Sequence, residues 1–267
     1  MNKLFVKTSS LIITMLAISI FSGGAAWAAK PAATTLTLLG NDISWPQCNK
    51  TLPKGQAFGI VGVNGGLANN TNPCLATQLA WAARSTGTTG QPRVGLYVNT
   101  ANPGFTGSWW PTSDTYRGDI VTNPYGTCTG GDDVACAYMY GYAKAYDDVT
   151  DRGVTNPTTY RWWLDVETIN SWEANTAANA ADLEGMTAYF QSIGASVGLY
   201  STSYQWGHIV GQVSDTSNLT NLKSWLPGAR SANSAKANCS AAPLTAGSTV
   251  TLTQYVSGSL DYDYSCL

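Results

Sequence analysis

Short apolar runs alternate with helical segments along most of this 267-residue chain, and that alternation limits the folds open to it. Apolar runs of strand length occur at 58–63, 93–98, 160–166 and 196–200. Helical patterns occur at 72–85, 134–152 and 175–193, and the last is followed by the helix-stop signal Gly194. This repetition predicts parallel strands that are covered by helices.

The same pattern distinguishes a closed barrel from an open sheet. Polar residues follow the apolar runs: Asn64, Asn99, and Asp165 with Glu167. A barrel gathers its chemistry at the carboxyl ends of its strands, and this distribution fits one. A doubly wound sheet would require a G-x-G-x-x-G turn, and the glycines after Asn64 lack that spacing. We therefore predict a TIM-like (β/α) barrel without a nucleotide site.

The run from Arg161 to Glu167 ends in two carboxyl groups separated by one residue. Side chains alternate along a strand, so Asp165 and Glu167 should point the same way with their Cβ atoms roughly 6.5–7 Å apart. Glycosidases use two carboxyl groups separated by about 5–5.5 Å or about 6.5–9.5 Å. The two acids are thus a candidate catalytic pair. The alternative is a buried strand whose last two acids simply reach solvent.

The first residues predict a secretory signal peptide. Lys3 and Lys7 precede an apolar stretch at 11–21, and small residues lead to Ala28, so we expect residues 1–28 to be removed after Ala28. The apolar stretch is shorter than the ~20 residues of a membrane span, and no later segment approaches that length. We expect a secreted protein, extracellular or associated with the cell wall. Residues 29–39 are a short lead-in, and 40–267 should form one domain.

The predicted mature chain is mildly acidic. Removal of Lys3 and Lys7 leaves 12 basic against 16 acidic residues, a formal charge of −4. This balance argues against nucleic acid as a partner. Charged residues make up only 11% of the chain, against a usual ~25%. A surface rich in Gly, Ser, Thr, Asn, Trp and Tyr suits carbohydrate, although it also suits exported proteins in general. We expect a monomer.

Six cysteines remain after the signal peptide. An even number in an exported chain favours three disulfides, for which 15 pairings exist. We predict that neighbours in the sequence pair: Cys48–Cys74, Cys128–Cys136 and Cys239–Cys266. We expect no metal or cofactor, because C-x-x-C spacing is absent and His208 is the only histidine. His208 also lacks a G-x-S-x-G partner, which disfavours a Ser-His-Asp hydrolase.

Several polar and aromatic residues are candidates for sugar contacts. Four tryptophans lie beside loop signals and either stack on sugar rings or pack in the core: Trp45, Trp109, Trp110 and Trp206. Trp162 and Trp163 alternate on one strand, so one should face the barrel interior and the other the helices. Asn64 and Asn99 either bind sugar hydroxyl or acetamido groups or cap the following helices.

A further acidic cluster lies late in the 134–152 segment. Asp147, Asp148 and Asp151 lack the D-x-D-x-D-G spacing of a calcium loop. We therefore predict that these three acids form a solvated face of the helix.

Motifs at both ends of the chain, taken with the D-x-E pair, resemble glycoside hydrolase family 25, the exported lysozymes or N-acetylmuramidases. That family opens with D-[VI]-S followed by Gln, and here Asp42-Ile43-Ser44 precedes Gln47. It closes with Q-Y and a V/L-D-x-N/D element, and here Gln254-Tyr255 precedes Leu260-Asp261-Tyr262-Asp263. Between them, Gly198-Leu199-Tyr200-Ser201 is similar to its G-x-Y-T/S strand, and Lys223-Ser224-Trp225-Leu226 to its Trp-containing strand. The resemblance covers nearly the whole mature chain.

This resemblance implies an irregular barrel of about eight strands, with fewer covering helices than the regular form and an acidic groove at the strand carboxyl ends. Position by position, it assigns the general acid/base to Glu167 and the group that steadies positive charge on the sugar to Asp165. It places Asp42 and Asp261 in the groove as further acids. Three more groove residues lie on the same motifs: Tyr200, Gln254 and Asp263. Convergent carboxyl groups repel one another, which raises the pKa of the least solvated group.

The chain also departs from the family pattern. Residues 63–66, Val-Asn-Gly-Gly, replace a charged string, so one wall of the groove differs, and the segment around Trp109 and Cys128 is an insertion. Three hypotheses follow. The first is a secreted glycosidase acting on β-linked amino-sugar glycan, with peptidoglycan first among the substrates. The second is a glycosidase for another cell-envelope polysaccharide, and the third is a non-catalytic glycan-binding or cell-envelope module on the same barrel.

Overall fold

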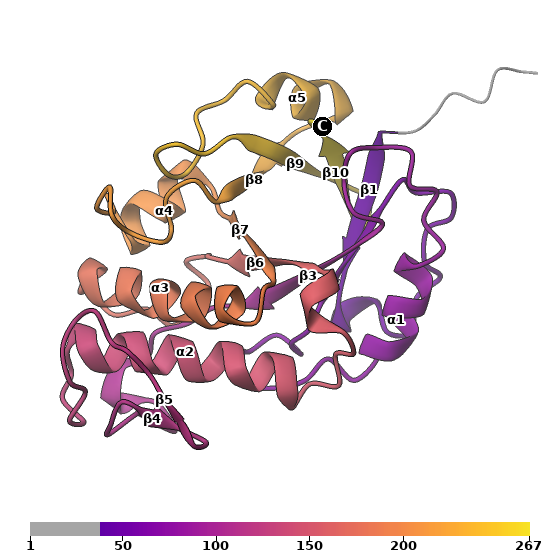
Figure 1. The fold of residues 1–267 in the computed structure, drawn as a ribbon. Coiled ribbons are helices and arrows are strands. Elements are labelled where there is room, and N and C mark those ends of the chain that lie inside the picture. Colours follow the sequence, from indigo (N-terminus) through magenta and orange to yellow (C-terminus); the bar gives the residue numbers. More distant parts are fainter. Residues whose placement is uncertain (1–37) are drawn as a thin grey trace, which may run out of the picture. The chain divides into compact units, whose positions relative to one another are not determined.

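Eight strands close into a barrel in the computed structural model, which describes residues 38–267 (Figure 1). Around the barrel the strands follow the order β1 (Leu39–Ile43), β10 (Leu260–Ser265), β9 (Val250–Ser257), β8 (Lys223–Ala229), β7 (Ser196–Tyr200), β6 (Arg161–Asp165), β3 (Val94–Asn99) and β2 (Gly59–Gly62). β10 is antiparallel to both of its neighbours, and the other neighbouring pairs are parallel. The irregular (β/α) barrel is therefore confirmed. The signal peptide predicted at 1–28 lies outside the described residues.

Helices cover this barrel incompletely. The described residues contain the helices α1 (Leu75–Ala82), α2 (Val134–Thr150), α3 (Thr176–Ser192), α4 (Ser203–Ile209) and α5 (Ala232–Asn238). Short 3₁₀ turns lie at Trp45–Gln47, Gly104–Thr106 and Pro157–Thr159, and a small hairpin of β4 (Thr115–Tyr116) and β5 (Asp119–Ile120) lies outside the barrel. Five helices against the eight of a regular barrel agree with the reduced covering that the family resemblance implied.

Local signals explain where the long helices begin and end. The side chain of Asp133 accepts a hydrogen bond from the N–H of Cys136 at the start of α2, and Asn175 does the same for Ala177 at the start of α3. These side chains satisfy N–H groups that have no partner within the helix. Gly194 follows α3 with a φ of +81°, a conformation that ends helices and favours glycine.

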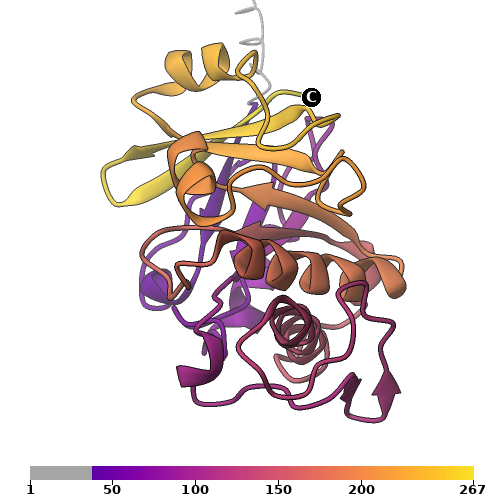
Figure 2. The ribbon, with the colours of Figure 1, turned by 90° about the vertical axis from the view of Figure 1, so that its left-hand side faces the viewer.

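α2 and α3 pack against each other at close range (Figures 1 and 2). Two glycines make this possible. A Cβ atom on Gly141 would lie 1.8 Å from the carbonyl oxygen of Asp182, and one on Gly185 would lie 2.0 Å from that of Tyr138. Any larger residue at either position would push the two helices apart.

The two adjacent tryptophans of β6 divide between two cores, as predicted. Trp162 faces the helices and stacks on Phe190 of α3, with ring centroids 4.7 Å apart. Trp163 points into the barrel and packs with Phe58, Trp225 and neighbouring apolar residues. Gly198 leaves room for it, because a Cβ there would lie 2.4 Å from the Trp163 ring. Large aromatic groups thus fill the barrel opposite positions that have no side chain.

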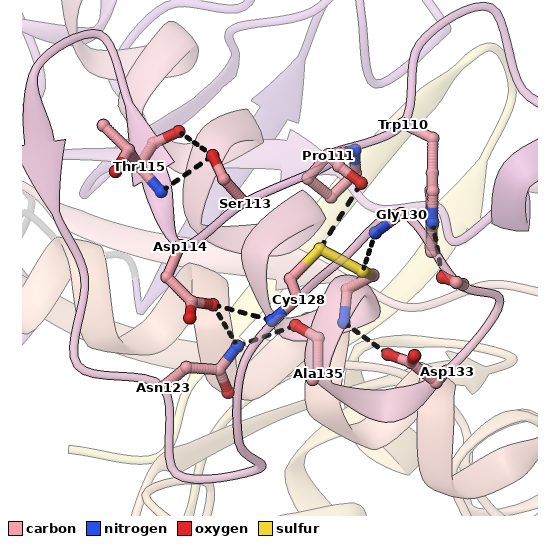
Figure 3. The surroundings of a disulfide bond; sticks show 12 residues. Trp110, Pro111, Ser113, Asp114, Thr115, Asn123, Cys128, Gly130, Asp133 and Ala135 are labelled. Atoms are coloured by element: carbon pink, nitrogen blue, oxygen red, sulfur yellow. Dashed lines mark hydrogen bonds between the residues drawn. A yellow bond between two sulfur atoms is a disulfide. The ribbon is translucent and has the colours of Figure 1, made fainter.

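Three disulfides join neighbouring cysteines: Cys48–Cys74, Cys128–Cys136 and Cys239–Cys266. The second ties the long segment between β3 and α2 to the first turn of α2 (Figure 3). Around it, a carboxyl oxygen of Asp114 accepts hydrogen bonds from the N–H of Cys128 at 3.0 Å and from Asn123 at 3.2 Å. This network holds the insertion against the helix. Within residues 38–267, helices long and apolar enough to cross a membrane are absent.

Candidate active site

A cavity of about 270 Å³ opens at the carboxyl ends of the parallel strands. Its lining residues come from seven different parts of the sequence: Asp42, Tyr97, Asp165, Glu167, Tyr200, Trp225, Gln254, Val256 and Asp261. They lie on the parallel strands, just beyond them, or, for Asp261, near the start of β10. Because β10 runs in the opposite direction, its first residues meet the ends of the other strands.

β6 places both acids of the D-x-E motif in this cavity. Asp165 is the last residue of β6 and points inward like Trp163, while Glu167 lies two residues further on the same side. Asp165 is deeper, with 7% of its surface exposed, and Glu167 is partly exposed at the rim. The indole N–H of Trp172 donates to the carbonyl oxygen of Glu167 at 2.8 Å, which steadies the turn that carries it.

Asp42 and Asp261 face each other across the pair β1–β10. The register places them directly opposite, so both side chains lie on the inner face of the barrel. Burial raises the pKa of Asp42 to about 7, and the charge of Asp261 adds to this effect, while a hydrogen bond from Gln254 acts against it. Burial also raises the pKa of Asp261. Two acids that meet in this way hold protons at pH values where an exposed aspartate has none.

Asp165 and Glu167 titrate as a coupled pair. Burial raises the pKa of Asp165 well above its usual value, and the charges of Glu167 and Asp42 raise it further. Burial also raises the pKa of Glu167, against hydrogen bonds from Gln205 and Asp165 that favour its ionised form. The hydrogen bond between the two acids raises the pKa of Asp165 and lowers that of Glu167, so a proton shared by the pair rests on Asp165.

A chain of hydrogen bonds crosses the wall of the cavity. The hydroxyl of Tyr200 donates to Oε1 of Gln254 at 2.9 Å, and Nε2 of Gln254 donates to Oδ2 of Asp42 at 2.8 Å. The ring of Tyr200 meets that of Trp225 edge-on, with centroids 4.5 Å apart. The two bonds fix the orientation of the Gln254 amide, so Asp42 always receives a donor from it.

Tyr97, Trp225 and Val256 line the cavity without having been predicted as site residues. Tyr97 stands opposite Gly62 in the register of β2 and β3. A Cβ atom on Gly62 would lie 2.7 Å from the Tyr97 hydroxyl, so the glycine makes room for the ring. Both residues are visible in the sequence, but only the strand register shows that the glycine stands opposite the tyrosine.

Five residues predicted to bind substrate do not line the cavity: Asn64, Asn99, Trp45, Trp206 and Asp263. Asn64 is completely buried and donates from Nδ2 to Oδ1 of Asp148 on α2 at 2.9 Å, so it joins β2 to that helix. Its other end accepts the backbone N–H of Asn99. Trp206 is buried in the core beneath α4. Trp45 is 48% exposed just after β1, beyond the cavity itself.

The acids of α2 also differ from their prediction as a solvated face. Asp148 is completely buried and Asp147 nearly so, whereas Asp151 is exposed as predicted. Asp148 accepts hydrogen bonds from Asn64 and Arg152, which take the place of water. Within the described part of the chain, groups of three or more His, Cys, Asp or Glu side chains placed to hold a metal ion are absent.

Sequence comparisons agree with this geometry. Residues 140–238 match the model of the family described as Lysozyme-like protein 1. The chain is 36% identical over 92 residues to Lysozyme-like protein 5 of Caenorhabditis elegans, a match covering 34% of this chain and 40% of that protein. It is 41% identical over 49 residues to Probable GH family 25 lysozyme 4 of Dictyostelium discoideum, covering 18% of this chain and 22% of that protein. The matches thus span less than half the length of these relatives.

Solved structures resemble the whole barrel. A family GH25 lysozyme from Aspergillus fumigatus superposes with a TM-score of 0.53 at 13% identity, covering 86% of this chain and 94% of that one. The bacterial lysozyme from Streptomyces coelicolor gives 0.50 at 16% identity, covering 87% and 94%. The modular Cpl-1 endolysin, solved with a peptidoglycan analogue, gives 0.52 at 18% identity, covering 86% and 54%. The chain therefore has the fold of the family-25 lysozymes, and the resemblance to that family is confirmed.

Proposed function

We propose that the protein is a secreted glycoside hydrolase that cleaves β-linked amino-sugar glycan, with peptidoglycan as its substrate. One observation carries the proposal: the carboxyl groups of Asp165 and Glu167 share a cavity with those of Asp42 and Asp261 at the carboxyl ends of the strands. Hydrolysis of a glycosidic bond needs one carboxyl group to protonate the leaving oxygen and another to meet the positive charge on the sugar. The lysozyme-like relatives support this class of reaction.

We assign different catalytic roles to Glu167 and Asp165 because they lie at different depths in the cavity. Glu167 at the rim reaches the glycosidic oxygen and acts as general acid, while Asp165 lies deeper and stabilises the cationic centre or a cyclised acetamido intermediate. At rest the pair holds one proton on Asp165, hydrogen-bonded to Glu167. A bound sugar displaces water from Glu167 and raises its affinity for that proton. The proton then passes to Glu167 and on to the leaving oxygen, and Asp165 becomes an anion where positive charge develops.

Further observations support a polymeric substrate and export of the protein. Trp45, which is exposed in the turn that follows β1, offers an aromatic face to a sugar ring. The Cpl-1 endolysin, which shares the fold, was solved with a peptidoglycan analogue. Export is part of the proposal, because three disulfides suit an oxidising compartment outside the cell. We take the acting form to be a monomer that starts after Ala28.

The test is release of reducing ends from purified peptidoglycan by the chain without residues 1–28. Glu167→Gln should lower the rate by about 10²–10⁴-fold, the usual contribution of a general acid. Asp165→Asn should lower it strongly as well. Asp215→Asn, which removes an exposed acid in the loop after α4, is the matched control and should keep full activity. Equal activity of Glu167→Gln and the wild type would refute the assignment of the acid.

A panel of other envelope polysaccharides tests a second candidate. The segment 63–66 favours it, because no charged side chain stands where the family pattern has a charged string, and Asn64 is turned away towards α2. Turnover of another polymer, with peptidoglycan untouched, would replace the substrate and keep the catalytic residues. Binding of glycan without turnover of any polymer would instead indicate a non-catalytic module.

A further inference from the structure

A fifth acid lies directly beneath the cavity. Asp263 follows Asp261 by two residues on β10, so it points to the same side, one step deeper in the barrel. In register it stands between Gly40 of β1 and Gln254 of β9. Its exposed surface is 0%, and it is not part of the cavity lining. Asp263 therefore cannot touch a substrate.

The surroundings of Asp263 do not suit an ionised carboxyl group. Among residues 38–267, hydrogen-bond donors in good geometry are absent for both of its oxygens, and ion pairs of the described residues all lie elsewhere. The groups that face it are Asp42 on β1, Asp261 on β10, the Trp225 indole on β8, the Tyr200 hydroxyl on β7 and the Tyr255 hydroxyl on β9. Two of these are acids. An anion held here would lack both water and a cation, which is strongly unfavourable.

A proton on Asp263 removes this difficulty. Burial, followed by the charges of Asp42 and Asp261, raises the pKa of Asp263 well above its usual value, although the indole of Trp225 acts against the rise. A protonated carboxyl group has an O–H that can donate, and Asp42 is the acid with which its side chain interacts through a hydrogen bond. That bond stabilises the ionised form of Asp42.

The hydrogen-bond chain in the cavity wall determines how the Gln254 amide is bonded to Asp42. The Gln254 carbonyl is used by Tyr200, so the Gln254 amide must donate to Asp42 through Nε2. Asp42 also shares a hydrogen bond with Asp263. We propose that Asp263 is a positioning residue that, as a neutral acid, donates a hydrogen bond to Asp42 and favours the ionised form of Asp42 in the cavity wall.

The charge of Asp42 also affects the protonation of the D-x-E pair. The anion of Asp42 is one of the groups that hold a proton on Asp165. A buried proton on Asp263 therefore helps to retain the proton that Asp165 and Glu167 share. The effect on turnover rests on the proposed glycosidase activity, whereas the protonation of Asp263 does not.

The experiment compares two substitutions of similar size. In Asp263→Asn, the amide N–H can still donate to Asp42, whereas Asp263→Leu has no donor. Carbon-13 NMR of aspartate carboxyl groups, followed against pH, measures protonation without reference to activity. The wild type should show a carboxyl signal that stays protonated at pH 7 and is missing from Asp263→Asn. Ionisation of Asp263 below pH 7 would overturn the proposal.

Reducing-end release against pH gives the second measurement. Asp263→Asn should stay within about threefold of the wild type, whereas Asp263→Leu should lose about tenfold or more. In Asp263→Leu the acidic limb should move to higher pH, because a carboxylate that loses a donor has a higher pKa. Equal damage in both variants, or an unchanged profile in Asp263→Leu, would contradict the positioning role.

Two controls keep the outcomes distinct. Asp182→Asn removes an equally buried acid of α3 that packs against α2 and is not part of the cavity lining, and it should leave the pH profile unchanged. Circular dichroism checks that each variant folds, and if Asp263→Leu does not, the NMR titration of the wild type and Asp263→Asn still decides. A wild type without glycosidase activity would refute the proposed function alone, since the titration would still report on Asp263.

Discussion

The buried carboxyl groups of the cavity at the end of the barrel and those of the helix α2 have different partners. All four ion pairs of residues 38–267 involve acids of α2 or its C-terminal cap. Asp148 there is bound by Arg152 and Asn64. In the cavity, Asp42, Asp165 and Asp261 have one another as charged neighbours.

The pKa values alone do not separate the two regions. Burial raises the pKa of Asp148 to about 7, the same value as for Asp42, although Arg152 acts against the rise. What differs is the space and the counter-charge: the cavity acids face a hollow of about 270 Å³, and Asp148 faces Asn64 and an arginine. A raised pKa therefore marks burial, and it indicates chemistry only where a ligand can enter.

The largest expected effect comes from neutralising one acid in each region. Asp165→Asn should lower glycan hydrolysis by about 10²-fold or more, as for other groups that act on the reacting atoms. Asp148→Asn should stay within about threefold of the wild type, because its amide oxygen still accepts from Asn64. Reducing-end assays on both variants check this, and an equal loss in the two would break the distinction between the regions.

Removal of the counter-charge on α2 should come next in size. Arg152→Gln leaves Asp148 buried without its cation, and we expect a loss of about 3 kcal/mol in the free energy of unfolding. The loss should be larger at pH 8 than at pH 5, because Asp148 must be ionised to need the arginine. Urea unfolding at the two pH values measures it. A loss that does not depend on pH would show that Arg152 acts through packing alone.

The pH dependence of stability should be a smaller effect, spread over several units. The pKa of Asp42 is about 7 in the folded protein against 3.8 for an exposed aspartate, so between these values the folded state holds a proton that the unfolded chain has released. Stability must then fall as pH rises from about 4 to about 7, by on the order of 1 kcal/mol per pH unit for one such group.

Thermal unfolding of the wild type and Asp42→Asn across this range checks the sign. The variant, which has no proton to lose at this position, should show the shallower decline. Stability that rises between pH 4 and pH 7 in the wild type would show that the buried acids are ionised in the folded state.

The barrel and its D-x-E pair could be predicted because their signals are local. Alternation within one strand brings Asp165 and Glu167 to one side, and Trp162 and Trp163 to opposite sides, whatever the neighbouring strands do. The predicted strands and long helices also appear with ends that differ by a few residues.

The residues that were missed or misplaced depend on how strands and helices meet. Tyr97 enters the cavity because Gly62 stands beside it in register. Asn64 follows its strand as a sugar-binding residue would, yet α2 presents Asp148 to it. Asp148 itself was expected on a solvated face, and it is buried by the same contact. Such partners lie far away in the sequence, so amino-acid composition and hydrophobic periodicity do not reveal them.

The cavity is complete only after the antiparallel strand β10 has joined the barrel during folding. Gln254 and Asp42, which share a hydrogen bond in the wall, are 212 positions apart in the chain. β1 leaves the ribosome first among the barrel strands and must wait for β10 to close the circle. Contacts so distant in sequence form slowly and late in folding. A partly synthesised chain therefore lacks the complete set of acids, and the four carboxyl groups meet only when the last strand has joined the first.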